Sequence, residues 1–155
     1  MIPMLQHPEQ AIIRAQLRQN EVLKGMSEED RAELEKALNI VDGAKSDYLL
    51  SQGVRDMEQY FILDGILKRT VSNPEGKEMI LRFAAEGDME TSYAAWRMGT
   101  PTPYSIVCVT KARVARLPLP QWVDFLERHR ATKDLFESAV MRLMTEVMGH
   151  TITLH

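Results

Sequence analysis

The chain contains 155 residues, of which 45% are hydrophobic and 26% are charged, and this is ordinary for a single globular domain with its own core. Its net charge of −3 gives no electrostatic footprint for nucleic acid or for an anionic membrane. A single cysteine excludes an internal disulfide framework, and neither a membrane-spanning run nor a signal-peptide pattern is present, so we expect a cytoplasmic protein.

The first segment, residues 1–38, has the spacing of short helices. Ile12, Ile13 and Leu17 recur at helical intervals and form one apolar face. Ser27 precedes three acidic residues, which is typical of an N-cap followed by the first turn of a helix. We therefore predict two or three short helices before the next segment.

The central segment, residues 39–117, consists of short strand-like pieces separated by turns, with a short helix inserted at residues 92–98. Closely spaced turns without alternating helices favour a sandwich or barrel over βαβ units. The expected strands are Ile40–Val41, Tyr48–Ser51, Gln59–Leu63, Ile66–Val71, Glu78–Phe83, Tyr104–Thr110 and Arg113–Leu117.

A hairpin is the clearest local signal in this segment. The turn Asn73–Gly76 contains a proline that presets φ and a glycine that accepts a positive φ. After it, Met79, Leu81 and Phe83 alternate with polar or exposed positions, which predicts a strand with one face toward a core. Gly87–Asp88 then ends the strand.

The last segment, residues 118–155, is helical in pattern, and residues 132–155 would form one helix roughly 36 Å long at 1.5 Å per residue. A first apolar stripe has coiled-coil spacing and comprises Phe136, Val140, Leu143, Val147, His150 and Leu154. A second stripe comprises Met141, Met144, Met148 and Ile152. Because one domain surface covers only one stripe, we expect the first to form the seam of a homodimer. A helix buried in one core is the alternative.

Four stretches resemble, in sequence and in order, the effector domain of the CRP/FNR family of bacterial transcription regulators. They are Tyr60–Gly65 (YFILDG), Glu75–Leu81 (EGKEMIL), Gly87–Asp88 and Val114–Leu117 (VARL). The resemblance implies a mostly β fold with flanking helices, namely a double-stranded, jelly-roll-like β-roll followed by a long C-terminal dimerisation helix. It also implies a small-molecule effector, and DNA binding through a domain absent from this chain. We expect the sensory part of a longer regulator, with a naturally short stand-alone sensor as the alternative.

The cyclic-nucleotide site that the resemblance implies is altered at every polar position. Family members that bind cyclic nucleotides hold the ribose with a Gly-Glu pair and the phosphate with an Arg-Ser pair, because a cyclic phosphate needs a cation and donors. Carried over without gaps, these pairs fall on Thr91–Ser92 and Thr102–Pro103. We therefore predict that cAMP and cGMP are poor ligands. Rescue of the phosphate site by Lys68 or Arg97 is the alternative.

The same region is nevertheless the predicted effector pocket, since its aromatic, methionine and hydroxyl side chains are typical of a small-molecule site. The predicted pocket residues are Met89, Thr91, Ser92, Tyr93, Trp96, Thr102, Pro103, Tyr104, Val147 and Met148. Taken singly, the aromatic residues fit a core or an interface equally well. A dimerisation scaffold with a filled pocket and no ligand is therefore the competing hypothesis.

Haem is the alternative effector, because several branches of the family resemble haem-carrying gas sensors. His150 interrupts the apolar seam and is the candidate ligand, although a register device explains it as well. None of the four histidines lies within residues 39–117, so a cupin-type metal centre is excluded. Cys108 lies among apolar residues without a nearby base, which favours an inert thiol. We predict no catalytic site.

Overall fold

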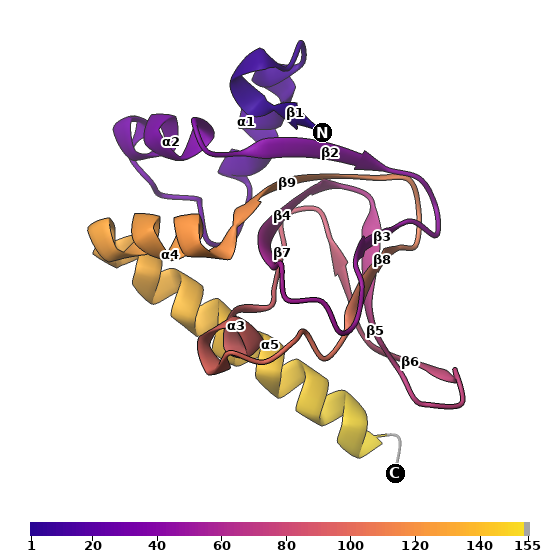
Figure 1. The fold of residues 1–155 in the computed structure, drawn as a ribbon. Coiled ribbons are helices and arrows are strands. Elements are labelled where there is room, and N and C mark those ends of the chain that lie inside the picture. Colours follow the sequence, from indigo (N-terminus) through magenta and orange to yellow (C-terminus); the bar gives the residue numbers. More distant parts are fainter. Residues whose placement is uncertain (154–155) are drawn as a thin grey trace.

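The computed structural model describes the backbone of residues 1–153 and the side chains of residues 1–147. Helices at both ends of the chain flank a β section made of two curved sheets (Figure 1). The elements are β1 (Ile2–Pro3), the 3-10 turn η1 (Met4–Gln6), α1 (Gln10–Arg18), α2 (Glu28–Glu35), β2 (Asn39–Gly43), β3 (Tyr48–Leu50), β4 (Glu58–Asp64), β5 (Ile66–Ser72), β6 (Glu78–Ala85), β7 (Met89–Thr91), α3 (Tyr93–Met98), β8 (Ser105–Cys108), β9 (Ala112–Pro118), α4 (Leu119–Arg128) and α5 (Arg130–Thr153).

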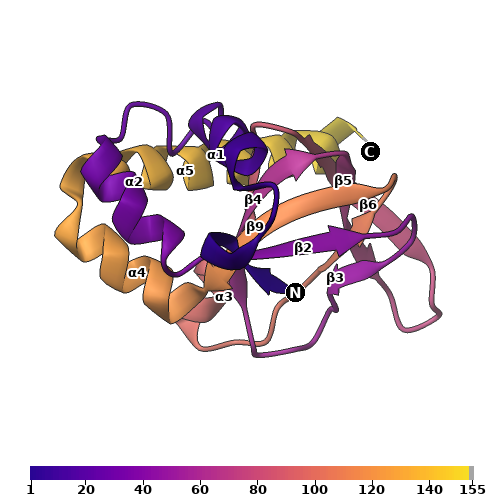
Figure 2. The same cartoon turned by 90° about the horizontal axis from the view of Figure 1, so that it is seen from above.

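The two sheets are antiparallel, with the strand orders β1-β2-β9-β4-β7 and β3-β8-β5-β6. Strands far apart in sequence are neighbours, as β2 and β9 are, so the sheets roll up rather than form a meander. Helix α5 runs along one side of this β-roll, and α1, α2 and α4 lie near it, so that residues of all four helices share one core (Figure 2). The predicted fold class, mostly β with flanking helices and a long C-terminal helix, is confirmed.

Two strands escaped the sequence analysis because each is too short for an alternating pattern to emerge. Strand β1 has two residues and pairs with β2, while β7 has three and pairs with β4. The N-cap prediction is confirmed, since the Ser27 hydroxyl accepts a hydrogen bond of 3.1 Å from the amide of Asp30 at the start of α2. Strand β7 is the more consequential of the two missed strands, because it leads directly into α3.

The predicted inward face of strand β6 is wrong at Met79 and Phe83, which are exposed. Arg69 of β5 is opposite Arg82, but its neighbour Thr70 is opposite Ile80, so Leu81 has no cross-strand partner. This β-bulge interrupts the alternation, so Met79 and Phe83 no longer share a face. Phe83 turns outward with its partner Lys68, and Met79 lies at the hairpin end of the strand.

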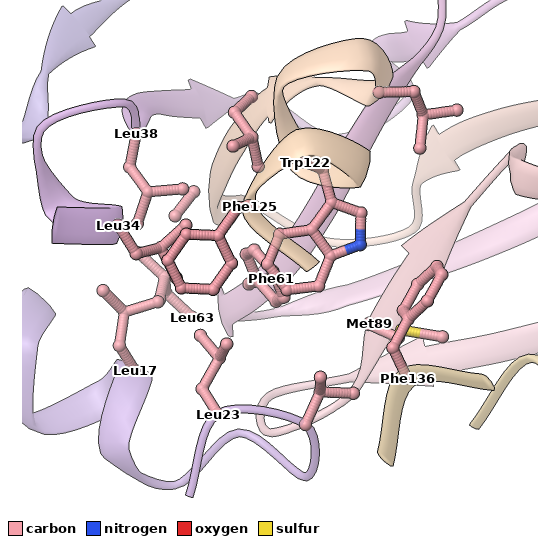
Figure 3. Packing of buried hydrophobic residues seen from close by; sticks show 14 of the residues in the cluster. Leu17, Leu23, Leu34, Leu38, Phe61, Leu63, Met89, Trp122, Phe125 and Phe136 are labelled. Carbon is pink, nitrogen blue, oxygen red and sulfur yellow. The ribbon is translucent and has the colours of Figure 1, made fainter. Parts of the chain in front are cut away.

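The main hydrophobic core lies between the five-stranded sheet and the helices (Figure 3). Trp122 of α4 is at its centre, with edge-on contacts to Phe61 of β4 and Phe136 of α5, at centroid distances of 5.2 Å and 5.5 Å, and a stacked contact to Phe125. Strand β4 and the two consecutive helices α4 and α5 therefore meet at one indole ring. This cluster fixes where α5 lies relative to the roll.

The packing of α5 corrects the predicted dimer seam. Phe136 and Leu143 have only 0% and 5% of their surface exposed, because they pack into the core of their own chain. They were wrongly assigned to a subunit interface. Val140 is also packed against that core. The roll therefore covers the first stripe, which includes Phe136. Of the other predicted seam residues, Val147 is partly exposed, His150 lies outside the described side chains, and Leu154 lies outside the described residues altogether.

The face of α5 beside the packed stripe is open in the chain. Met141 and Met144, about one turn apart, expose 65% and 49% of their surface. Two neighbouring large apolar side chains are unusual on a surface that contacts only water. Leu135 is 47% exposed but lies on another side of the helix. The first stripe, which was predicted for the seam, packs against the roll over its described residues Phe136, Val140 and Leu143, and Met141 and Met144 of the second stripe are exposed. Periodicity identifies stripes and carries no information about which surface covers each.

Candidate ligand-binding site

A cavity of about 330 Å³ lies between the β-roll and α5. Strands β5 and β6, the segment from β7 into α3, and the loop before β8 form one side of it, and α5 forms the other. The lining residues are Arg69, Val71, Leu81, Thr91, Tyr93, Ala94, Ala95, Pro103, Tyr104, Val140, Leu143, Met144 and Val147. Most of these side chains are apolar, and Arg69 is the charged one among them.

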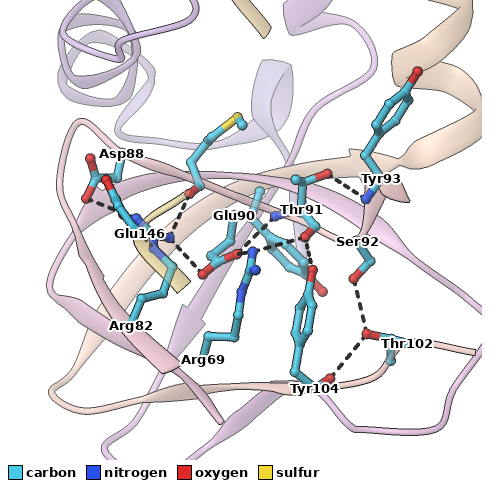
Figure 4. A network of polar contacts seen from close by, with 12 residues as sticks. Arg69, Arg82, Asp88, Glu90, Thr91, Ser92, Tyr93, Thr102, Tyr104 and Glu146 are labelled. Atoms are coloured by element: carbon cyan, nitrogen blue, oxygen red, sulfur yellow. Dashed lines mark hydrogen bonds and ion pairs between the residues drawn. The ribbon is translucent and has the colours of Figure 1, made fainter. Parts of the chain in front are cut away.

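An ion cluster adjoins this cavity (Figure 4). Glu90 of β7 is 1% exposed and accepts hydrogen bonds from Arg69 of β5 at 2.5 Å and from Arg82 of β6 at 2.8 Å. Arg69 is itself only 7% exposed. Three strands thus bring two guanidinium groups to one buried carboxylate. The bulge in β6 is what points Arg82 at Glu90 although the preceding residue, Leu81, faces the cavity.

The cluster is ionised. Burial is the largest influence on Glu90 and raises its pKa, but Arg69 and Arg82 together outweigh burial and leave that pKa below its ordinary value. Burial likewise lowers the pKa of Arg69 most strongly, yet the facing Glu90 and Tyr104 leave that pKa above its ordinary value. Arg69, Arg82 and Glu90 therefore carry a combined charge of +1 at neutral pH, because two cations share one anion.

Two further residues shape the polar corner of the cavity. The ring of Tyr104 lies 4.0 Å from the guanidinium carbon of Arg69 in a cation–π contact, and the Tyr104 hydroxyl donates to the Thr91 carbonyl. Burial raises the pKa of Tyr104, so this hydroxyl keeps its proton. The Thr91 hydroxyl accepts from the amide of Tyr93 at 3.2 Å, which leaves its own proton free to donate to a group in the cavity.

Ser92, at an implied ribose position, and Thr102, at an implied phosphate position, have a structural role here. The hydroxyl groups of Ser92 and Thr102 lie 3.3 Å apart, and that of Thr102 donates to the Tyr104 carbonyl at 3.2 Å. Both residues are buried, and neither lines the cavity. These contacts hold the loop before β8 against the start of α3, and they offer no cation for a phosphate.

The predicted pocket is partly reproduced by the cavity wall. Five predicted residues line it, namely Thr91, Tyr93, Pro103, Tyr104 and Val147. Four do not, and the prediction is corrected there: Met89 is a fully buried core residue, Ser92 and Thr102 bond to each other, and Trp96 lines a separate, more polar cavity beside β4. The side chain of Met148 lies outside the described ones.

The sequence analysis missed the charged residues of the site. Neither Lys68 nor Arg97 reaches the cavity, because Lys68 pairs with Glu78 at 2.9 Å and Arg97 lies outside, 6.0 Å from the Tyr93 ring. The arginine that does reach it is Arg69. One signal was available, since Arg69 stands two residues after buried Leu67 in a strand and so shares its inward face.

No metal site is evident in the part of the chain whose side chains are described. Those residues contain no group of three histidine, cysteine, aspartate or glutamate side chains that could hold an ion. Cys108 is buried, and that burial raises the pKa of its thiol, which disfavours the reactive thiolate. Within the same described portion, no helix is both long enough and apolar enough to cross a membrane.

The sequence profile of the cyclic nucleotide-binding domain matches residues 42–129, which is more than half of the chain. The chain belongs to this family. No curated protein sequence matches it significantly.

Solved structures share the fold at low identity. The regulatory subunit of a cAMP-independent protein kinase A from Trypanosoma brucei aligns with a TM-score of 0.73 and 17% identity, over 94% of this chain and 53% of that one. The sensor domain of the transcriptional regulator DNR from Pseudomonas aeruginosa gives 0.71 and 18%, over 91% and 92%. The catabolite activator protein of Thermus thermophilus gives 0.71 and 13%, over 87% and 63%. This domain therefore spans about half the length of the kinase subunit and almost all of the DNR sensor domain.

Proposed function

We propose that this domain is the effector-binding and dimerisation part of a cytoplasmic CRP/FNR-type transcription regulator. Its task is regulatory, not enzymatic. It binds a small molecule other than cAMP between the β-roll and α5, and it reaches DNA through a domain outside this chain. The resemblance in the four sequence stretches and the fold shared with transcription regulators support this proposal.

The observation that carries the proposal is that the cavity is walled by two separate parts of the fold. Val140, Leu143 and Met144 of α5 face residues of the roll across it. A ligand there touches both parts at once, so it can favour one position of α5 over another. Such a preference between two states is what allows a ligand to shift a population.

Binding of cAMP is disfavoured by charge. The implied phosphate positions, Thr102 and Pro103, supply no cation, and the hydroxyl of Thr102 is already bonded within the loop. Arg69 is nearby, but it is paired with Glu90 and does not stand at an implied phosphate position. An apolar wall completes a site that suits a less polar ligand.

Dimerisation uses the exposed stripe of α5 in this proposal. Met141 and Met144 present apolar surface along the helix, and Met144 also lines the cavity. One side chain therefore contacts both the ligand space and the proposed seam. This gives ligand binding a short route to the packing of two α5 helices against each other.

A ligand screen with a blocked cavity tests the function. Thermal unfolding of the purified chain would be followed with cAMP, cGMP and a panel of apolar metabolites. Ala94→Trp fills the cavity from its exposed rim, and Ala131→Trp, at an exposed position on α5 outside the cavity, is the matched control. We expect stabilisation by a panel member that Ala94→Trp abolishes and Ala131→Trp preserves, and no response to cyclic nucleotides.

Other results would replace the proposal. Micromolar cAMP that stabilises the chain would contradict the charge argument. A Soret band in the purified protein would favour the haem-dependent sensor. An intact dimer with no response to any compound would favour the ligand-free scaffold.

A further inference from the structure

Burying the charged side chain of Arg69 costs free energy unless other groups compensate the charge. The residue is 7% exposed, and it lies in the wall of a cavity whose other side chains are mostly apolar. A buried charge is tolerated only when it is paired and its donors are satisfied. How far Arg69 meets these two conditions, pairing and satisfied donors, indicates which class of ligand the cavity can bind.

The first condition is only half met, because Arg69 shares its counter-ion. Glu90 bonds to Arg69 and to Arg82 at 2.5 Å and 2.8 Å. Arg82 has two more carboxylates nearby, Asp88 at 4.0 Å and Glu146 at 3.5 Å. Among the described side chains, Glu90 is the one carboxylate within ion-pair distance of Arg69. Arg69, the arginine that faces the cavity, thus has a share in one carboxylate, whereas Arg82 has three.

The second condition is not met. Both hydrogen bonds that Arg69 makes to described residues, to Glu90 and to the Thr91 carbonyl, come from Nη2. Its Nε is buried without any acceptor among those residues. Unused donors on a buried cation are the complement of an anionic oxygen.

We propose that the cavity binds a monocarboxylate with an apolar body, whose carboxylate pairs with the free N–H groups of Arg69. This rests on the proposed function, since it names the ligand class of the same site. The Thr91 hydroxyl is placed in the same wall as a second donor. Val71, Leu81 and Val140 surround the apolar body.

Charge and size narrow the class further. Arg69 is one cation with unused donors and so suits one carboxylate, whereas a phosphate monoester of charge about −2 would lie beside Glu90 without a second free cation. The volume of about 330 Å³ is roughly twice that of a cavity that holds benzene, about 150 Å³. A ligand with one or two rings, or a medium alkyl chain, fits that space.

The test compares acids with their uncharged amides. The probes are 4-phenylbutanoate, indole-3-acetate and octanoate, each measured beside its primary amide by calorimetry on the whole chain. Arg69→Met removes the proposed anchor. Arg82→Met is the matched control, because it also removes one guanidinium from Glu90 but its side chain does not line the cavity.

We expect at least one acid to bind wild type tenfold or more tightly than its amide, and to lose that preference in Arg69→Met. Arg82→Met should retain it. Amides that bind as tightly as the acids, or a preference that survives in Arg69→Met, would overturn the carboxylate inference and leave the effector cavity standing. Failure of every acid and amide to bind would overturn the carboxylate inference. If the metabolite panel failed as well, the proposed function would fall with it.

Discussion

Replacing Glu90 with glutamine is the most direct probe of the buried cluster. The change keeps the shape of the side chain but removes the one negative charge that faces Arg69 and Arg82 at 2.5 Å and 2.8 Å. Two hydrogen bonds to a neutral amide contribute about 1 kcal/mol each. Removing one partner of a buried ionic cluster costs about 3–5 kcal/mol, because charge is left uncompensated. The larger figure is the prediction for Glu90→Gln.

Urea unfolding at neutral pH measures this loss, with Glu146→Gln as the control. Glu146 also pairs with Arg82, at 3.5 Å, but it is exposed, so its removal should change the free energy of unfolding by less than about 1 kcal/mol. A loss below about 1 kcal/mol for Glu90→Gln would refute the claim that the cluster is desolvated and ionised.

The pH dependence gives a second check with a defined sign. The pKa of Glu90 in the folded protein lies below its ordinary value, since its two arginines outweigh burial. Its contribution is therefore complete above the unfolded value of about 4.3 and is lost as the pH falls through the lower folded value. The stability difference between wild type and Glu90→Gln should stay constant from pH 7 to about pH 5 and shrink below that. A difference that grows on acidification would contradict the assignment.

The remaining predictions concern the seam, a turn and the core. Met141→Asp should give a monomer by gel filtration with light scattering, and an unchanged dimer would exclude the exposed stripe as the seam. Gly65→Ala should cost about 2 kcal/mol or more in denaturant unfolding, because φ is +88° and an added Cβ would lie 2.4 Å from the Lys111 carbonyl oxygen; Gly53→Ala, at φ +93° in open space, should cost less. Phe136→Ala should lower the free energy of unfolding by about 3–5 kcal/mol. If it dissociated the dimer without such a loss, the packing of α5 would need revision.

The fold was predictable because its signals are local. The turn Asn73–Gly76, the glycines that end strands and the N-cap Ser27 act within a few residues, and the four stretches that resemble the family follow the same order as the elements they form. The short strand β7 was missed, since three residues carry no periodicity.

The site was less predictable because it depends on pairing between distant segments. Glu90 meets Arg69 and Arg82 only after β4 pairs with β7 and β5 pairs with β6 in one register. Nothing local marks these three residues as neighbours. Which stripe of α5 packs against the roll likewise depends on tertiary contacts, such as the contact between the Phe136 ring and Trp122.

Because of the bulge in β6, the number of residues in this strand decides which side chains line the cavity. Because Leu81 is unpaired, it lines the cavity while the next residue, Arg82, reaches Glu90. Deleting one residue from this strand would restore strict alternation and turn one of the two side chains outward. A family that keeps this scaffold can therefore change what it recognises by gaining or losing a single residue, without replacing any side chain in the wall.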